Sequence, residues 1–169
     1  PPRDRRQRQM CIRDRKTFHT IDADDPFFCG HEVRRSLNYL NSFSLDIVKP
    51  TTISSNGSGL VGYSAKADIF YRLSKKIKIN TNTEMMWNYF KKINNIKIKR
   101  LPKSKFDCDA RLTLDYIEDY FFLESIRILL GNLTSRKKIC NLLKKNPDLK
   151  KINYFRNREW KNNQKIKSK

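Results

Sequence analysis

The sequence predicts an α/β domain in which strands and helices alternate along the chain. An apolar strand at 17–21, a helical pattern at 31–40 and a second strand at 45–50 give the strand–helix–strand order of a βαβ unit. Farther along the chain, residues 112–130 predict a short strand that leads directly into a helix. The 169 residues are enough for one domain with a hydrophobic core. We therefore expect one α/β domain.

The first elements follow from apolar spacing and from two prolines. Residues 17–21 suit a buried strand, and Pro26 fixes the turn in the loop that leaves it. Apolar residues recur at spacings of four and three from 31 to 40, which predicts a helix with one buried face. Residues 45–50 form a short strand that ends at Pro50.

The middle of the chain begins with a segment rich in Ser, Thr and Gly at 51–70. Such a segment can present backbone amides and hydroxyls to a ligand, and it can equally be a plain surface loop. Helical spacing follows at 66–76 and at 83–93, with Thr83 as the N-cap of the second helix. Alternation at 96–101 predicts a half-exposed strand.

The C-terminal part repeats the order of the first elements. A strand at 112–114 ends on Asp115 and leads into a helix that Gly131 closes. An amphipathic helix follows from 135 to about 146, where a proline stops it. We interpret residues 16–155 as the structured domain and residues 156–169, which have no apolar pattern, as a basic tail.

The first fifteen residues differ from the rest of the chain because they are rich in Arg, whereas the rest prefers Lys. They resemble translated adapter sequence, and we exclude them from the fold prediction. Removal of their six arginines and two aspartates lowers the net charge from +20 to +16. Since the native part then begins inside a strand, we expect that an N-terminal portion of the domain is missing.

The remaining charge has two explanations. It is either a surface for nucleic acid or the result of a coding bias that places Lys at exposed positions. An RNA-binding protein would use the basic helices with Tyr154 and Trp160 as stacking partners. The excess lysines, however, are spread over every predicted exposed helix face, and the chain is also rich in Asn and Ile, as a coding bias would produce. RNA binding also gives no reason for the acidic loop at 22–25. We therefore do not expect nucleic acid as the partner.

Several classes of site and location are not expected from the composition. The four cysteines show no metal-ligand spacing, so no zinc site is predicted. No run of about twenty apolar residues predicts a membrane span. Since there is also no secretory pattern, the cytoplasm is the expected location.

Aspartates follow two of the predicted strands. Asp24 lies with Asp22 and Asp25 after the first strand, and Asp115 follows the strand at 112–114. Because ligands bind beyond the carboxyl ends of strands in open α/β sheets, these carboxylates can converge on one site. Two facing carboxylates without a cationic partner repel each other, and a divalent cation such as Mg²⁺ relieves this repulsion. Capping of a turn and of a helix is the alternative role for the two residues.

Four stretches of the chain are TIDADDPFF, DIVKPTTISSNGSGLVGYS, NTEMMW and RLTLDYIEDYFFLESIRILLGNLTSRKKICNLLKKNPDLKKIN. Together they resemble the C-terminal half of the cytidylyltransferase family, which includes CMP-sugar synthetases for acidic sugars and relatives named after spore coat polysaccharide biosynthesis. The resemblance covers nearly all of 17–155 and is strongest in RLTLDYIED, where Ile117 replaces the usual Pro.

The resemblance implies a nucleotide-diphospho-sugar transferase fold with a mixed, mostly parallel sheet and flanking helices. It implies transfer of CMP from CTP to a sugar with release of pyrophosphate. It assigns Mg²⁺ binding and catalysis to Asp24, although Ala23 replaces the usual Gly, and to Asp115. It assigns substrate binding to a further set of residues: Asp22, Ser54, Ser55, Asn56, Gly57, Tyr63, Glu84 and Arg111.

The resemblance also leaves open questions about activity. The family's N-terminal glycine-containing loop, which holds the nucleotide triphosphate, has no counterpart here, so we expect this polypeptide alone to be inactive. A homodimer is an expectation from the resemblance only. A glycosyltransferase that uses a sugar nucleotide remains an alternative, since folds of this kind host both activities.

Overall fold

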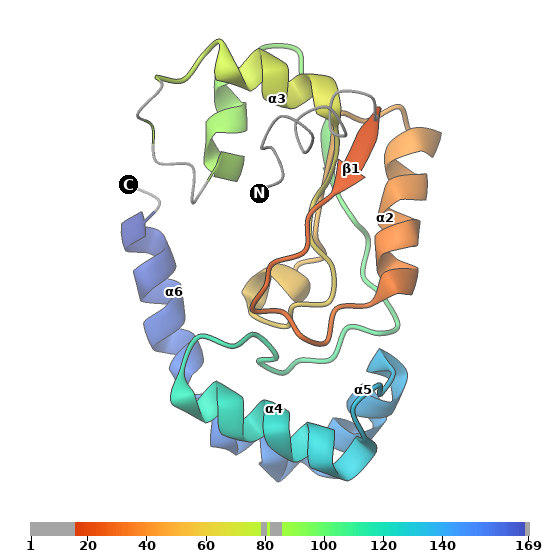
Figure 1. The fold of residues 1–169 in the computed structure, drawn as a ribbon, viewed down its shortest axis with the longest axis vertical. Helices are drawn as coiled ribbons and strands as arrows, with labels where there is room; N and C mark the ends of the chain where they lie inside the picture. The colour runs from red at the N-terminus through yellow and green to blue at the C-terminus, as the bar shows by residue number, and fades with distance from the viewer. Residues whose placement is uncertain (1–15, 79–80, 82–85, 168–169) are drawn as a thin grey trace, which may run out of the picture.

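A four-stranded sheet has helices packed against both of its faces. The computed structural model describes residues 16–78, 81 and 86–167. The strands are β1 (Thr17–His19), β2 (Ile47–Lys49), β3 (Ser64–Lys66) and β4 (Ile98–Arg100). The α-helices are α2 (Gly30–Ser42), α3 (Ala67–Ser74), α4 (Ile117–Leu130), α5 (Arg136–Lys145) and α6 (Arg156–Lys167). Short 3₁₀ helices are η1 (Ser54–Asn56), η2 (Met86–Lys92) and η3 (Pro147–Ile152). The strand β1 lies in the upper part of Figure 1, and the C-terminal helices lie toward the bottom.

The sheet has the order β1-β3-β2-β4 and is mixed. β3 runs antiparallel to both β1 and β2, and only β2 and β4 are parallel neighbours. The prediction of a mostly parallel sheet is therefore wrong. The reason is that the connection from β2 to β3 contains only η1 and no α-helix that could return the chain to the other end of the sheet. β1 and β2 still point the same way, as the βαβ order predicts, but β3 lies between them.

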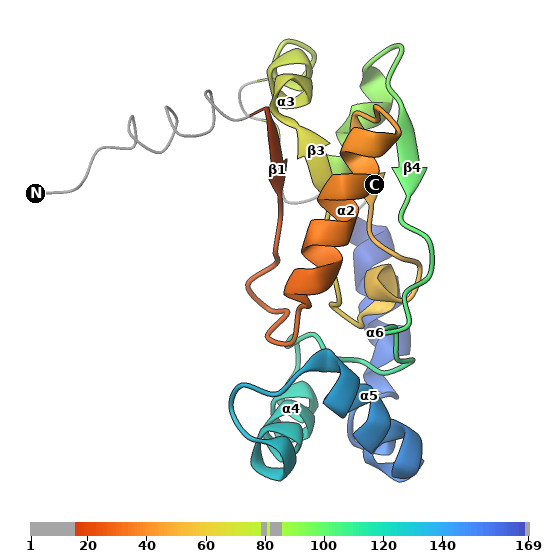
Figure 2. The same ribbon diagram turned by 90° about the vertical axis from the view of Figure 1, so that its right-hand side faces the viewer.

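Strand β2 separates two apolar clusters because successive side chains of a strand point to opposite faces. Val48 packs with Leu40 of α2, whereas Ile47 packs with Ile69 of α3 and with η2. Figure 2 shows α2 lying against the strands, with α4 and α5 beyond one end of them. The sheet thus has α2 on one face and α3 with η2 on the other.

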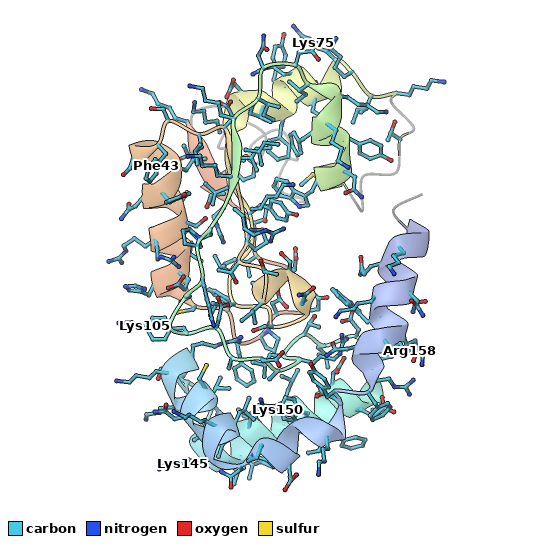
Figure 3. All side chains as sticks on the ribbon, turned by 180° about the vertical axis from the view of Figure 1, so that it is seen from behind. Phe43, Lys75, Lys105, Lys145, Lys150 and Arg158 are labelled. Atoms are coloured by element: carbon cyan, nitrogen blue, oxygen red, sulfur yellow. The ribbon has the colours of Figure 1, made fainter. Side chains whose placement is uncertain are left out.

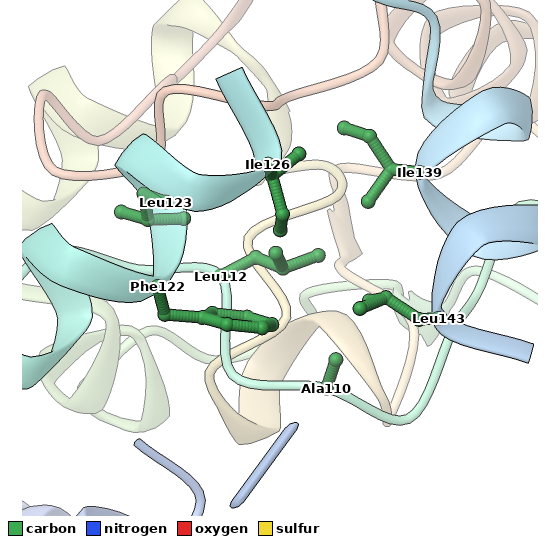
Figure 4. Packing of buried hydrophobic residues seen from close by; sticks show 7 residues of the cluster. All are labelled: Ala110, Leu112, Phe122, Leu123, Ile126, Ile139 and Leu143. Carbon is green, nitrogen blue, oxygen red and sulfur yellow. The ribbon is translucent and has the colours of Figure 1, made fainter. Parts of the chain in front are cut away.

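A third apolar cluster holds the C-terminal helices together (Figure 4). Phe122 and Ile126 of α4 meet Ile139 and Leu143 of α5. The segment at 110–114 contributes Ala110 and Leu112 to this cluster but is not a strand. Its amides pair with two different loops, since Leu112 donates to the carbonyl of Gly57 at 2.8 Å and Leu114 to that of Asp24 at 2.8 Å. The predicted strand at 112–114 is wrong for this reason.

Most other predicted elements are present. The helices at 31–40, 66–76, 115–131 and 135–146 correspond to α2, α3, α4 and α5, and the strands at 17–21, 45–50 and 96–101 to β1, β2 and β4. The helix at 83–93 appears as η2 from Met86 onward, and its predicted cap Thr83 lies outside the described residues.

The expected basic tail is helical from 156 to 167, as α6. Arg156 fastens this helix to α4 through two bonds to Glu118, of 3.0 and 2.7 Å. No helix in the described ranges is both long and apolar enough to cross a membrane.

Candidate functional site

The acidic loop, residues 20–29, connects β1 to α2 and folds back on itself. The amide of Asp25 donates to the carbonyl of Asp22 at 3.1 Å, which makes a tight turn. The amide of Cys29 donates to the carbonyl of Leu60 at 2.8 Å, so the loop is tied to the segment before β3. Its three aspartates are thereby held at one end of the sheet.

Asp24 is joined to the segment before α4 by backbone and side chain. Its carbonyl accepts the Leu114 amide, and the Thr113 hydroxyl donates to Asp24 Oδ2 at 3.3 Å. Asp115 directly follows Leu114 in this segment. Asp24 and Asp115, which are 91 positions apart in the sequence, therefore lie at one place, close enough for the charge of Asp24 to raise the pKa of Asp115.

A buried arginine holds Asp115 from the other side. Arg111 has no exposed surface and donates to Asp115 Oδ2 at 2.6 Å. It also binds both carboxylate oxygens of Asp119, at 2.8 and 2.9 Å. Asp119 Oδ2 in turn accepts the amides of Asp115 and Tyr116 at 3.0 Å each, which caps the start of α4. This buried network occupies the guanidinium of Arg111, the residue to which the resemblance assigns substrate binding, and that assignment stays a prediction.

The carboxylates of the site are crowded and partly buried. Burial raises the pKa of Asp25 to about 7, and repulsion from Asp24 and Asp22 adds to the shift. Burial and Asp24 likewise raise the pKa of Asp22. Burial also raises the pKa of Asp115; the charge of Arg111 opposes this shift, and Asp24 adds to it. The site thus concentrates negative charge that the described basic residues compensate only in part.

Asp25 titration tests this repulsion. In the protein without divalent cations, we expect a ¹³C NMR titration of the Asp25 carboxyl to give a pKa of about 7, and Asp22→Asn to lower it, because one of its repelling charges is gone. The folded state then binds more protons than the unfolded chain between pH 3.8, the ordinary pKa of an aspartate, and about 7, so this group makes stability fall as pH rises through that window. An unchanged Asp25 pKa in Asp22→Asn would contradict the proximity of the two groups.

Gly59 packs closely against the Asp25 side chain of the acidic loop. Its φ is +54°, and a Cβ at this position would lie 2.1 Å from Asp25 Oδ1. We expect Gly59→Ala to lower the free energy of unfolding by about 1–3 kcal/mol, since the substitution adds both backbone strain and a collision. Urea denaturation measures the change. Gly30→Ala is the matched control because a Cβ at Gly30 meets no atom within 4 Å; equal stability of the two variants would disprove the close packing of Asp25.

The loop at 54–62 is built by its own hydroxyl groups. Ser54 is buried, donates to the carbonyl of Val61 at 2.8 Å and accepts the amides of Leu60 and Val61 at 3.0 Å each. Its hydroxyl therefore shapes the loop, and the assignment of Ser54 to substrate binding stays a prediction. Ser55 accepts a bond from Arg100 at 3.0 Å and is exposed.

The next two predicted residues differ in exposure. Asn56 is exposed, whereas Gly57 is buried beside Arg111, where a Cβ would lie 3.5 Å from Arg111 Nη1. Gly57 also has a φ of +92°, which favours glycine. Glu84 lies outside the described residues.

Tyr63 forms an aromatic wall with a residue that the sequence analysis did not select. Its ring stacks on Trp87 of η2 at a centroid distance of 3.8 Å and an angle of 6°. Burial raises the pKa of Tyr63, the charge of Arg100 opposes this shift, and the charge of Asp22 adds to it. The wall therefore lies near both the acidic loop and the exposed side of the 54–62 loop. Trp87 could have been chosen as one of two tryptophans in the chain.

Arg136 is a second residue that the sequence analysis missed. It is 4% exposed and donates to the carbonyls of Phe27, at 3.2 Å, and Ser58, at 2.7 Å. It thus fastens the end of the acidic loop to the loop that carries Gly59. The one signal for it in the sequence is an arginine in a chain that prefers lysine.

The donor set suits a hard divalent cation. Asp24 uses Oδ2 toward Thr113 and Asp115 uses Oδ2 toward Arg111, and the described residues donate no hydrogen bond to Oδ1 of either. In the described part of the chain, no three or more His, Cys, Asp or Glu side chains form a metal site. Mg²⁺ commonly takes one or two carboxylates and fills its other positions with water and substrate phosphates, so two free oxygens fit it.

No protein-family model and no curated protein matches the sequence. The structure does match a solved cytidylyltransferase from Leptospira borgpetersenii serovar Hardjo-bovis (strain JB197), with a TM-score of 0.69 and 16% identity. The fold is cytidylyltransferase-like. The alignment covers 86% of this chain and 63% of the solved chain, so this chain spans less than two thirds of that protein's length.

Proposed function

We propose that the chain is part of a nucleotidyltransferase that transfers CMP from CTP to an acidic sugar, in the synthesis of surface polysaccharides or glycans. The observation that carries the proposal is the approach of Asp24 to Asp115 in a cytidylyltransferase-like fold. The solved neighbour is a cytidylyltransferase by name, and the likeness at 16% identity supports the fold. CTP and the sugar are the proposed partners, and Mg²⁺ is the proposed cofactor.

The reaction forms a bond between the sugar hydroxyl oxygen and the α-phosphorus of CTP, and the hydroxyl proton passes to water. The bond from the α-phosphorus to the bridging oxygen breaks, and pyrophosphate leaves with the electron pair. Bound Mg²⁺ would neutralise charge on the phosphates and orient them. Asp24 and Asp115 would hold the cation through their free Oδ1 atoms. Thr113 holds Asp24 and Arg111 holds Asp115 through the Oδ2 atom of each carboxylate.

The other parts of the site have supporting roles in this proposal. The acidic loop brings Asp22 beside Tyr63, whose stack on Trp87 provides a rigid flat wall for a sugar or base. The exposed residues Ser55 and Asn56 supply polar groups on the loop at 54–62. These contacts would orient the hydroxyl toward the α-phosphate, which is the positioning component of catalysis.

The test is an assay of pyrophosphate release with a protein that contains this chain and the remaining third of the fold. With CTP, an acidic sugar and Mg²⁺, we expect pyrophosphate and a CMP-sugar, and we expect neither when EDTA removes the cation. Release of a nucleoside diphosphate from a sugar nucleotide, with no pyrophosphate from CTP, would instead indicate the glycosyltransferase alternative. No turnover with any nucleoside triphosphate would overturn the proposal.

The excess of positive charge is the observation that favours RNA binding as the alternative function. Lys75, Lys105 and Lys145 project at well-separated points of the surface (Figure 3). A filter-binding titration is expected to show only weak, sequence-independent association with RNA at physiological salt. Tight binding with a steep salt dependence would favour the RNA-binding alternative.

A further inference from the structure

Two cysteines that the proposed reaction does not use lie close together, where α5 packs against the segment after β4. Cys108 belongs to this segment, and Cys140 lies on α5. The Cys140 thiol donates to the carbonyl of Phe106, two residues before Cys108, at 3.3 Å. The Cys108 side chain packs against the apolar cluster that includes Ile139, the neighbour of Cys140. The two thiols are near enough for each to act on the pKa of the other, although 32 positions separate them in the sequence. Both residues are partly exposed.

The surroundings of the pair favour a reactive thiol at Cys108. Interaction with the Cys140 thiol lowers the pKa of Cys108 to about 7; burial opposes this shift, and the charges of Arg136 and Lys150 add to it. The same interaction raises the pKa of Cys140, whose S–H is held by the Phe106 carbonyl. Thiolates, not thiols, react with oxidants, so Cys108 is assigned as the attacking member and the carbonyl-bound Cys140 as the resolving member.

We propose that Cys108 and Cys140 form an oxidation site that reacts with hydroperoxides and closes to an intramolecular disulfide. In the first step the Cys108 sulfur attacks one oxygen of hydrogen peroxide, the O–O bond breaks, and Cys108 becomes a sulfenic acid as water leaves. In the second step the Cys140 sulfur attacks the Cys108 sulfur and displaces its hydroxyl, which takes the Cys140 proton and leaves as water. Two thiols lose two electrons in total, and one peroxide gains them.

The position of the pair links oxidation to the packing beneath the acidic loop. The Cys108 carbonyl accepts a bond from the Ser58 hydroxyl at 3.3 Å. Arg136, whose charge acts on both thiols, holds the carbonyls of Ser58 and Phe27. The disulfide would therefore fasten the segment at 102–110 to α5 at the point where α5 supports the loops of the site.

Peptide mapping of the full chain tests the proposal. The reduced protein is treated with hydrogen peroxide, remaining thiols are alkylated, and trypsin digests the product without reductant. We expect the peptides 106–111 and 139–144 to appear as one cross-linked species whose mass is lower than their sum by two hydrogen atoms. We expect Cys29 in peptide 17–34 to stay alkylated, which makes it an internal control. Alkylation of both Cys108 and Cys140 after peroxide treatment, or a dominant bond to Cys29, would overturn the proposal.

A variant separates the two roles. In Cys140→Ser the resolving thiol is gone, so we expect Cys108 to accumulate as a sulfenic acid that a 1,3-dicarbonyl reagent traps, whereas Cys29→Ser should form the same disulfide as the unchanged chain. A Cys140→Ser protein in which peroxide leaves Cys108 as a free thiol would show that Cys108 is not the attacking residue and would overturn the proposed order of steps.

Discussion

Replacing Arg111 with methionine is expected to lower the free energy of unfolding by about 3–5 kcal/mol, because it leaves a buried carboxylate without its partner. Arg111 and Asp119 are both 0% exposed, and two hydrogen bonds join them. The loss is a large fraction of the roughly 5–15 kcal/mol that stabilises a typical domain. Arg111 also lies 5.1 Å from the ring centre of Tyr116 and 5.6 Å from that of Trp160, so the same change loosens α6.

Chemical denaturation followed by tryptophan fluorescence measures the change, since Trp160 reports on this region. Lys151→Met is the matched control: Lys151 pairs with Asp148, but both side chains are more than 80% exposed, and exposed pairs contribute little. Arg111→Lys should fall between the two, because a lysine keeps the charge but cannot bind both Asp119 oxygens as a planar fork does. Similar stabilities for Arg111→Met and Lys151→Met would show that the buried network does not hold the C-terminal part together.

The helices could be predicted from the sequence because each carries its signals locally. Apolar residues at helical spacing mark α2, and Gly131 marks the end of α4 with a φ of +86°. β3 could not be predicted because Ser64 and Ala65, which are fully buried, show neither bulk nor alternation in a segment rich in Ser and Gly. Its place between β1 and β2 follows from tertiary packing, and so does its antiparallel pairing with both of them.

The candidate site could be predicted in part for the same reason. Three aspartates in a short loop of a basic chain are visible in the sequence, and so is Asp115 after a second apolar segment. From these two positions the sequence predicts that the carboxylates converge. The buried position of Arg111 could not be predicted, because an arginine is ordinarily exposed. Its burial depends on Asp119 and on Asn153, and Asn153 donates hydrogen bonds to Arg111 and to Asp119. The helix α6 could not be predicted from apolar spacing, because ionic bonds such as that of Arg156 to Glu118 attach it to the rest of the fold.

Asp24→Asn and Asp115→Asn are each expected to lower Mg²⁺-dependent pyrophosphate release by about a hundredfold or more, in a protein that contains the complete fold. An amide oxygen carries no full charge, so either variant weakens the hold on the cation, and loss of one ligand is enough because the proposal gives the cation two protein carboxylates. The measurement is the initial rate of pyrophosphate release as a function of Mg²⁺ concentration.

Asp148→Asn is the control for the loss of one negative charge, because Asp148 is exposed on η3, away from the site. Thermal denaturation of all three variants separates a local effect from unfolding. Asp24→Asn keeps an oxygen for the Thr113 hydroxyl and Asp115→Asn keeps one for Arg111, so neither substitution removes the acceptor that holds its side chain. Full activity in either folded variant would exclude that residue from the cation site, whereas equal losses that excess Mg²⁺ partly restores are the result that a shared cation requires.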